Sequence, residues 1–119
     1  MNININMFKL LDWIDINKIN WDGLFCNPNA IELLKENQNK INWKYLSANL
    51  NAIELLKNNQ DKIFWPCLSA NANAIELLKK NQDKINWESL SLNPNIFKYD
   101  YKKMKLNMKN SGIAEELTT

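Results

Sequence analysis

The stretch Asn51-Ala52-Ile53-Glu54-Leu55-Leu56-Lys57 decides the fold, because the same seven residue types begin again at Asn29 and at Asn73. Each copy is followed by Asn-Gln and then by Lys-Ile at fixed offsets before a tryptophan. Tryptophan recurs every 22 residues, at Trp21, Trp43, Trp65 and Trp87. An isoleucine two positions before it and a leucine three positions after it keep the same period. Such strict self-similarity is the signature of a tandem repeat.

Within one unit, the apolar residues have helical spacing. Ala30, Leu33 and Leu34 fall on one side together with the neighbouring Ile31, whereas the charged residues between positions 32 and 36 fall on the other. The pair Asn27-Pro28 marks the start, since Asn caps free backbone amides and Pro is tolerated at the first helical position. We therefore expect a first helix of about ten residues in each unit.

A second, shorter helix is predicted around each tryptophan. Asn42 is its candidate N-cap, and Trp43 and Leu46 lie three apart on one face. The same pattern recurs from Asn86, and Pro66 fits where only a helix start accepts a proline. Helices this short are marginal in water, so neighbouring units must cover them. The repeating Ile, Leu and Trp residues are accordingly predicted to form the core.

The predicted architecture is an all-α solenoid of 22-residue helix-turn-helix repeats, with about four to five units and a hand that the sequence leaves open. It forms one domain over residues 1–119, with an N-terminal cap at 1–26, central repeats at 27–92 and a C-terminal cap at 93–119. Residues 7–14 resemble the first helix with one residue extra. A longer helix is expected from residue 93 to about 106 or 108, with a break at 110–112 and a short turn or frayed end at 113–119.

Composition narrows the class of protein. The 119 residues include 22 Asn, 15 Lys and 13 Ile, and the skew is interpreted first as AT-rich codon usage, because Asp, Ser or Gln could supply the same surface chemistry. A net charge of +2 gives no strong field for a polyanion. Cys26 and Cys67 lie far apart at different phases of the repeat, so no disulfide is expected, and Cys26 is expected to be buried. With no signal peptide and no apolar span, an intracellular protein that is not secreted and not in a membrane is predicted.

The motif Leu-Ser-x-Asn-Pro-Asn-Ala-Ile-Glu-Leu-Leu-Lys, followed by Asn-Gln-Asp-Lys-Ile-Asn-Trp, resembles short tandem repeats of giant DNA viruses of the mimivirus group. The resemblance covers residues 8–117, and the stretches 93–101 and 113–117 are similar to the way such arrays close. It implies a viral origin, a helical repeat fold and a location in the host cytoplasm or the virion. Relatives often extend into a His-Pro-Arg-like tail that this sequence lacks, so no role of that tail is implied.

Positions that differ between otherwise identical repeats are the candidate partner-binding residues, because the core must repeat while a contact face is free to vary. Tyr45 and Phe64 are the expected anchors. The other candidates are Lys44, Pro66, Cys67, Glu88 and Ser89. The alternative is that these are solvent positions that drift without constraint.

Phe64 is the sharpest case, because it replaces a capping Asn and gives up a cap worth about 0.5–2 kcal/mol. Either Trp65 takes over as the cap position ahead of Pro66, or the exposed ring serves a partner. Cys67 is interpreted as a free thiol.

No enzyme is predicted, and neither a cofactor nor a metal ion. Acidic residues recur in identical context at Glu32, Glu54 and Glu76, so they line a solvated ridge and do not converge in a pocket. Histidine is absent, and two glycines cannot build a phosphate loop. The leading hypothesis is a protein-protein interaction scaffold for a host or virion protein. The alternatives are a self-associating structural component and an RNA-binding repeat, the latter disfavoured by the lack of arginine and the balanced charge.

Overall fold

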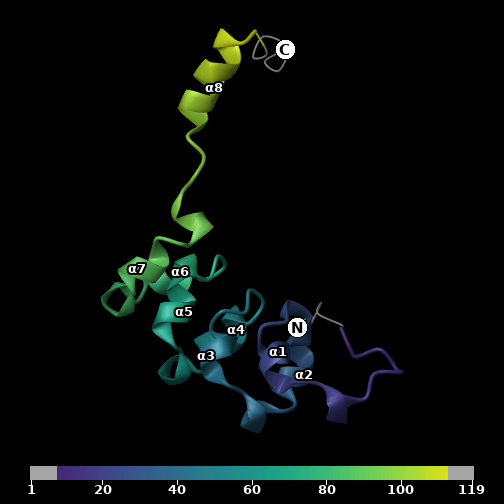
Figure 1. Cartoon of the computed structure of the whole chain (residues 1–119). Coiled ribbons are helices and arrows are strands. Elements are labelled where there is room, and N and C mark those ends of the chain that lie inside the picture. Colours follow the sequence, from purple (N-terminus) through teal and green to yellow (C-terminus); the bar gives the residue numbers. More distant parts are fainter. Residues whose placement is uncertain (1–7, 113–119) are drawn as a thin grey trace, which may run out of the picture.

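The structure is a computed structural model that describes residues 8–112 and consists of short helices stacked along a curved path (Figure 1). Over this range it contains no β-strand, so the predicted all-α repeat fold is confirmed. The helices are α1 (Trp21–Phe25), α2 (Ile31–Lys35), α3 (Trp43–Leu46), α4 (Ile53–Lys57), α5 (Trp65–Ser69), α6 (Ile75–Lys79), α7 (Trp87–Leu90) and α8 (Tyr101–Asn110).

The first helix of each unit is shorter than expected, with five residues in α2, α4 and α6. An asparagine side chain ends it. Asn37 Nδ2 donates to the Leu33 carbonyl four residues earlier at 2.8 Å, which takes the acceptor that the Asn37 backbone amide would use in a longer helix, and that amide donates to the Leu34 carbonyl at 3.0 Å. Asn59 and Asn81 do the same in α4 and α6. The chain then makes a 3₁₀ turn that the periodicity did not predict, at Gln38–Lys40, Gln60–Lys62 and Gln82–Lys84.

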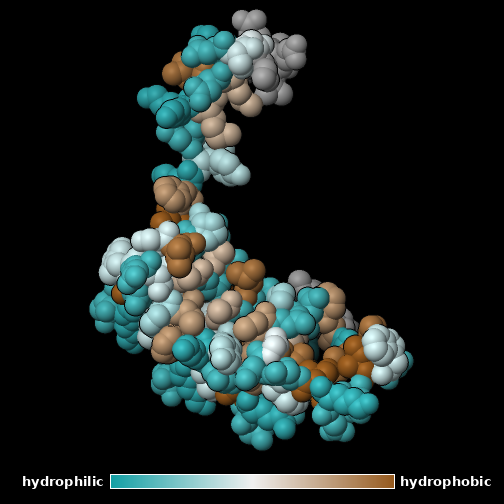
Figure 2. Space-filling view, in the orientation of Figure 1, coloured by the Kyte–Doolittle hydropathy of each residue, from teal (hydrophilic) through white to brown (hydrophobic). Residues whose placement is uncertain are grey.

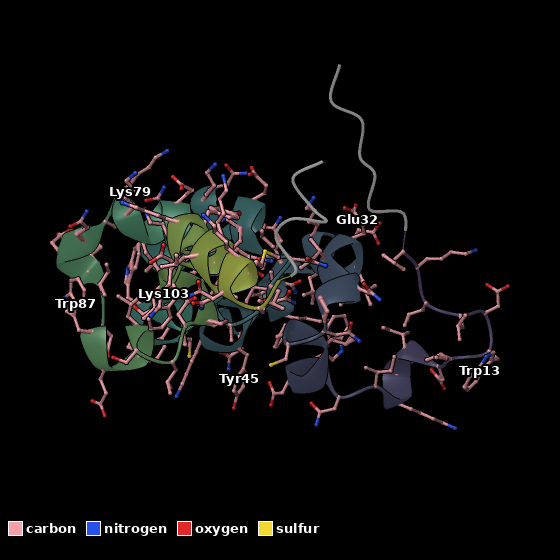
Figure 3. The ribbon with its side chains drawn as sticks, turned by 90° about the horizontal axis from the view of Figure 1, so that it is seen from above. Trp13, Glu32, Tyr45, Lys79, Trp87 and Lys103 are labelled. Carbon is pink, nitrogen blue, oxygen red and sulfur yellow. The ribbon has the colours of Figure 1, made fainter. Side chains whose placement is uncertain are left out.

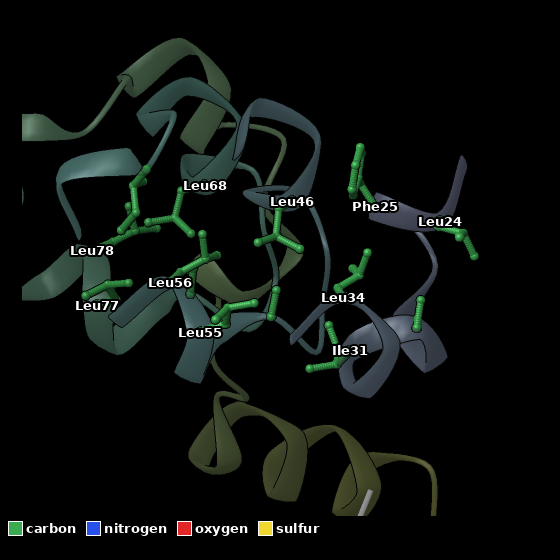
Figure 4. Packing of buried hydrophobic residues seen from close by; sticks show 14 residues of the cluster. Leu24, Phe25, Ile31, Leu34, Leu46, Leu55, Leu56, Leu68, Leu77 and Leu78 are labelled. Atoms are coloured by element: carbon green, nitrogen blue, oxygen red, sulfur yellow. The ribbon is translucent and has the colours of Figure 1, made fainter. Parts of the chain in front are cut away.

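The core consists mainly of the repeating leucines (Figure 4). Fully or almost fully buried are Leu34, Leu46, Leu56, Leu68 and Leu78. The tryptophans are less buried than a core role requires. Trp21, Trp43 and Trp65 are half-buried, and each carries a lysine from the next unit over its ring, with Nζ to centroid distances of 5.1, 5.1 and 5.3 Å. Each of these rings therefore packs partly against the core and also takes a cation–π contact from a lysine.

A ladder of buried asparagines joins consecutive units. Asn71 is 3% exposed; its Nδ2 donates to the carbonyls of Ser47 and Asn49, both at 3.0 Å, and its Oδ1 accepts from the Asn73 amide. Asn49 and Asn93 make the corresponding three bonds one unit earlier and later. Asp has no donor for this role, Ser has a single hydroxyl and Gln is one methylene longer. These buried asparagines therefore have a structural role that AT-rich codon usage does not explain.

Two further kinds of hydrogen bond recur between units, one at three interfaces and the other at two. Asn73 Nδ2 donates to the Leu50 carbonyl at 2.8 Å, and Asn51 and Asn95 do the same at their own interfaces. Ser47 Oγ donates to the Trp43 carbonyl and accepts the Phe64 backbone amide at 2.9 Å. Ser69 repeats this arrangement with Asn86. The units of Ser47 and Ser69 thus present to the next one a fixed set of carbonyls, a hydroxyl and a tryptophan ring, whereas the first unit has Phe25 in place of the serine.

The N-terminal stretch departs from the prediction. Residues 8–14 contain only a turn, and the first helical element is the 3₁₀ helix Ile16–Lys18. The expected helix over 7–14 is therefore not formed; Met7 itself lies outside the described part. Short helices need a neighbouring unit to cover them, and Phe8, Leu11 and Trp13 are all exposed.

The C-terminal stretch departs from it as well. The 3₁₀ helix Pro94–Ile96 is followed by extended backbone at Phe97, and a separate helix α8 starts after Asp100, whose side chain accepts from the Lys103 amide at 3.0 Å. The prediction of one helix running from residue 93 is wrong, but the predicted break at 110–112 is confirmed, because α8 stops at Asn110 and Gly112 has φ +82°. Residues 97–112, which we call the arm, project away from the stack (Figure 1). The predicted final turn at 113–119 lies outside the described residues.

Candidate interaction surface

The seven candidate residues lie on the second helices of three consecutive units. We call them the variable row: Lys44 and Tyr45 on α3, Phe64, Pro66 and Cys67 at the start of α5, and Glu88 and Ser89 on α7. Because the repeat places each member 22 residues from its equivalent, the row follows the direction of the stack. Tyr45 points outward from the stack in the view from above (Figure 3).

The structure brings two members of the row from neighbouring units into contact. Lys44 Nζ lies 5.2 Å from the centroid of the Phe64 ring, which is 39% exposed, and Tyr45 is 41% exposed. Glu88 is also exposed, whereas Pro66, Cys67 and Ser89 are half-buried. The accessible part of the row is therefore two aromatic rings with a cation beside them, and an anion one unit further along.

Phe64 occupies the N-cap position of α5 without a side-chain capping bond. In α3, Asn42 Oδ1 accepts from the amides of Lys44 and Tyr45. Pro66 has no amide at the position of Lys44, so one of the two donors that a cap would satisfy is missing from α5. The alternative in which Trp65 becomes the cap is wrong, because Trp65 is the first residue of the helix. Because Phe64 and Pro66 occur together, the loss of the asparagine cap destabilises α5 less than it would destabilise a helix with a backbone amide at the position of Pro66.

Outside the variable row, residues 8–112 offer few features that could form a functional site. Cys26, the C-cap residue of α1, is exposed, which corrects the expectation that it is buried. Within residues 8–112, no three His, Cys, Asp or Glu side chains gather as a metal site would need. A groove of about 300 Å³ between α4 and α6 is lined by Ile53, Lys57, Gln60, Asn73, Glu76, Leu77, Lys80 and Asn81. No helix among residues 8–112 is long and apolar enough to cross a membrane.

The arm is a feature that sequence reasoning missed. It carries five lysines and one aspartate, whereas residues 8–96 contain ten lysines and ten acidic residues. Tyr99 and Tyr101 are exposed on it, with ring centroids 5.8 Å apart. The cluster of lysines after residue 97 is visible in the sequence, but its separation from the neutral stack is not. The overall charge of +2 therefore conceals a neutral stack and a basic arm.

No protein-family model, curated protein or solved structure matches the chain.

Proposed function

We propose that the chain is a non-catalytic scaffold that binds a segment of another protein along the variable row. One observation carries the proposal: the residues that hold the units together repeat almost without change, while exposed positions of the second helices differ from unit to unit. A repeat stack presents such positions as one continuous surface. Exposed aromatic side chains in the middle of that surface are the groups that most often anchor a protein interface.

The chemistry of the row indicates what the partner must offer. An acidic side chain would face Lys44, and apolar or aromatic side chains would cover the rings of Tyr45 and Phe64. A basic side chain one unit further along would face Glu88, so the partner segment has a defined direction. Together with the resemblance to giant-virus repeats, this favours a host or virion protein as the partner, met in the host cytoplasm or in the virion.

The double variant Tyr45→Ala/Phe64→Ala tests the proposal. We expect tagged wild-type protein from infected cells to recover a partner protein that the variant does not recover. With the purified partner, the variant should bind roughly tenfold more weakly than the wild type or worse, because aromatic anchors commonly contribute that much. Both rings are exposed, so the circular dichroism spectrum should not change. Tyr99→Ala/Tyr101→Ala is the matched control, since it removes two exposed aromatic rings from the arm. Equal recovery by the row variant and the wild type would contradict the proposal.

A further inference from the structure

At the C-terminal end of the stack, several hydrogen-bond acceptors and a tryptophan ring lack, within residues 8–112, the partners that their equivalents have in inner units. The carbonyls of Ser91 and Asn93 correspond to those of Ser47 and Asn49, yet no asparagine amide reaches them within residues 8–112. Ser91 Oγ donates to the Trp87 carbonyl but receives no backbone amide in that range, unlike Ser47 and Ser69. Trp87 is 64% exposed, and among residues 8–112 no lysine lies over its ring as one does over each of the three preceding tryptophans.

An apolar groove of about 350 Å³ lies at this same end. It is lined by Ile75, Leu78, Lys79, Gln82, Ile85, Trp87, Leu90, Asn95 and Ile96. In an inner unit, the equivalent residues Ile53, Lys57, Gln60 and Asn73 face α6, the first helix of the following unit. Here the chain continues as extended backbone after Ile96 and leads into the arm, so the place of that helix is not filled by residues 97–112.

The N-terminal end of the stack displays the complementary donors. Asn27 is equivalent to Asn49, Asn71 and Asn93, and its Oδ1 accepts the Asn29 amide, but its Nδ2 donates to nothing in the described chain. Asn29 is equivalent to Asn51, and its Nδ2 is equally unused. The Asn20 backbone amide corresponds to those of Phe64 and Asn86, and Lys18 corresponds to the lysines that cover the inner tryptophans.

We infer that the two ends bind each other between copies of this chain, head to tail and in the 22-residue register. In that register Asn27 Nδ2 of the second copy reaches the carbonyls of Ser91 and Asn93. Asn29 Nδ2 reaches the Pro94 carbonyl. The Asn20 amide reaches Ser91 Oγ, and Lys18 covers the Trp87 ring. Every one of these contacts already exists between neighbouring units inside the stack, so the proposed interface continues an established one.

The apolar surface at both ends fits this occupant. The N-terminal stretch resembles a first helix in sequence, and it exposes Phe8 and Leu11. In a second copy it would lie over the apolar groove and gain the neighbour that a short helix needs. Figure 2 shows hydrophobic side chains at the base of the arm and along the N-terminal stretch. Trp13 and Trp87 lie on opposite sides of the molecule (Figure 3), so one copy cannot satisfy both ends by itself.

A contact between two different surfaces is heterologous, and it yields open chains of copies unless the rotation closes a ring. It uses the ends of the stack, so it does not depend on the variable row or on the proposed function. The wild-type chain is therefore expected to show a weight-average mass that rises with concentration in sedimentation equilibrium. Growth beyond a dimer is the expected pattern.

Two variants block one end each. Asn27→Asp keeps the oxygen that accepts the Asn29 amide but replaces the free amide by a carboxylate facing two carbonyls. Trp87→Lys puts a cation where Lys18 of the next copy would lie. Each variant alone should lose self-association by roughly tenfold or more. An equimolar mixture should form a one-to-one dimer and stop there, because one good end remains on each partner.

Two controls carry the same kinds of substitution away from the ends. Asn39→Asp occupies a position where the following units already have Asp61 and Asp83, and Tyr101→Lys replaces an exposed aromatic residue on the arm. Both should assemble like the wild type. A wild-type chain that stays monomeric at every concentration would overturn the inference, as would a mixture that gains no dimer or end variants that assemble normally. Loss of a partner with the Tyr45/Phe64 variant is a separate readout, so the two proposals can fail independently.

Discussion

Asn71→Asp should lower the free energy of unfolding by about 2–6 kcal/mol, because it leaves two buried carbonyls without a donor at about 1–3 kcal/mol each. The substitution is almost isosteric and keeps the oxygen that accepts the Asn73 amide, so the shape of the turn is preserved. The substitution removes the two 3.0 Å hydrogen bonds to the carbonyls of Ser47 and Asn49, and it places a carboxylate oxygen next to these two carbonyl oxygens. Urea denaturation followed by circular dichroism measures the difference.

Asn73→Asp is the matched control for this variant. Asn73 is exposed and its side chain makes one hydrogen bond to the preceding unit, to the Leu50 carbonyl at 2.8 Å. A single solvent-accessible bond of this kind contributes about 0.5–1.5 kcal/mol. Equal losses in the two variants would mean that the buried ladder does not hold the units together.

Leu56→Ala should cost about 2–5 kcal/mol, since the side chain is fully buried in the centre of the stack and its removal leaves a cavity between units. That is a large share of the roughly 5–15 kcal/mol by which a domain of this kind is stable. The change should appear as a lower urea midpoint with an unchanged slope.

Leu50→Ala makes the same chemical change at an exposed position where the next unit already has Ala72. Its expected effect stays within about 0.5 kcal/mol, as for most surface substitutions. If Leu50→Ala were as costly as Leu56→Ala, the assignment of the leucine core would be wrong.

The repeat and its core could be predicted from the sequence because they depend on period alone. The 22-residue spacing and the Leu33-Leu34 pattern locate the helices, and Asn42 is the N-cap that its position predicts. Helix lengths could not be predicted in the same way. Asn37 looks like another residue of the first helix, but its side chain takes the carbonyl that would have continued the helix.

The asparagine ladder had a signal in the sequence that composition concealed. Asn27, Asn49, Asn71 and Asn93 are the same in all four units, while Glu36, Asn58 and Lys80 differ at another shared position. An Asn that never varies in an Asn-rich chain is easily attributed to codon usage. Its role in joining the units becomes visible only in the structure, where the preceding unit places two carbonyls within reach of one side-chain amide group.

The two ends could not be predicted because their structure depends on what lies next to them. Residues 8–14 and the stretch after Asn93 both carry apolar residues at nearly helical spacing. Residues 8–14 form only a turn, and the backbone becomes extended at Phe97 before α8 begins. A helix of a few residues is marginal in water unless a neighbouring unit covers it. Four of the seven predicted members of the variable row are exposed, and the contact between Lys44 and Phe64 could be found only from the packing of successive units.

Hydrogen exchange of the asparagine side-chain amides, followed by NMR, tests the central claim most directly. The claim is that buried asparagines join the units in register. The account predicts that the Nδ2 protons of Asn49 and Asn71 exchange slowly, with an opening free energy close to that of global unfolding, while those of Asn39 exchange at an almost unprotected rate. Exchange of Asn49 and Asn71 as fast as that of Asn39 would contradict the account, because it would show that these amides face water and not the carbonyls of the preceding unit.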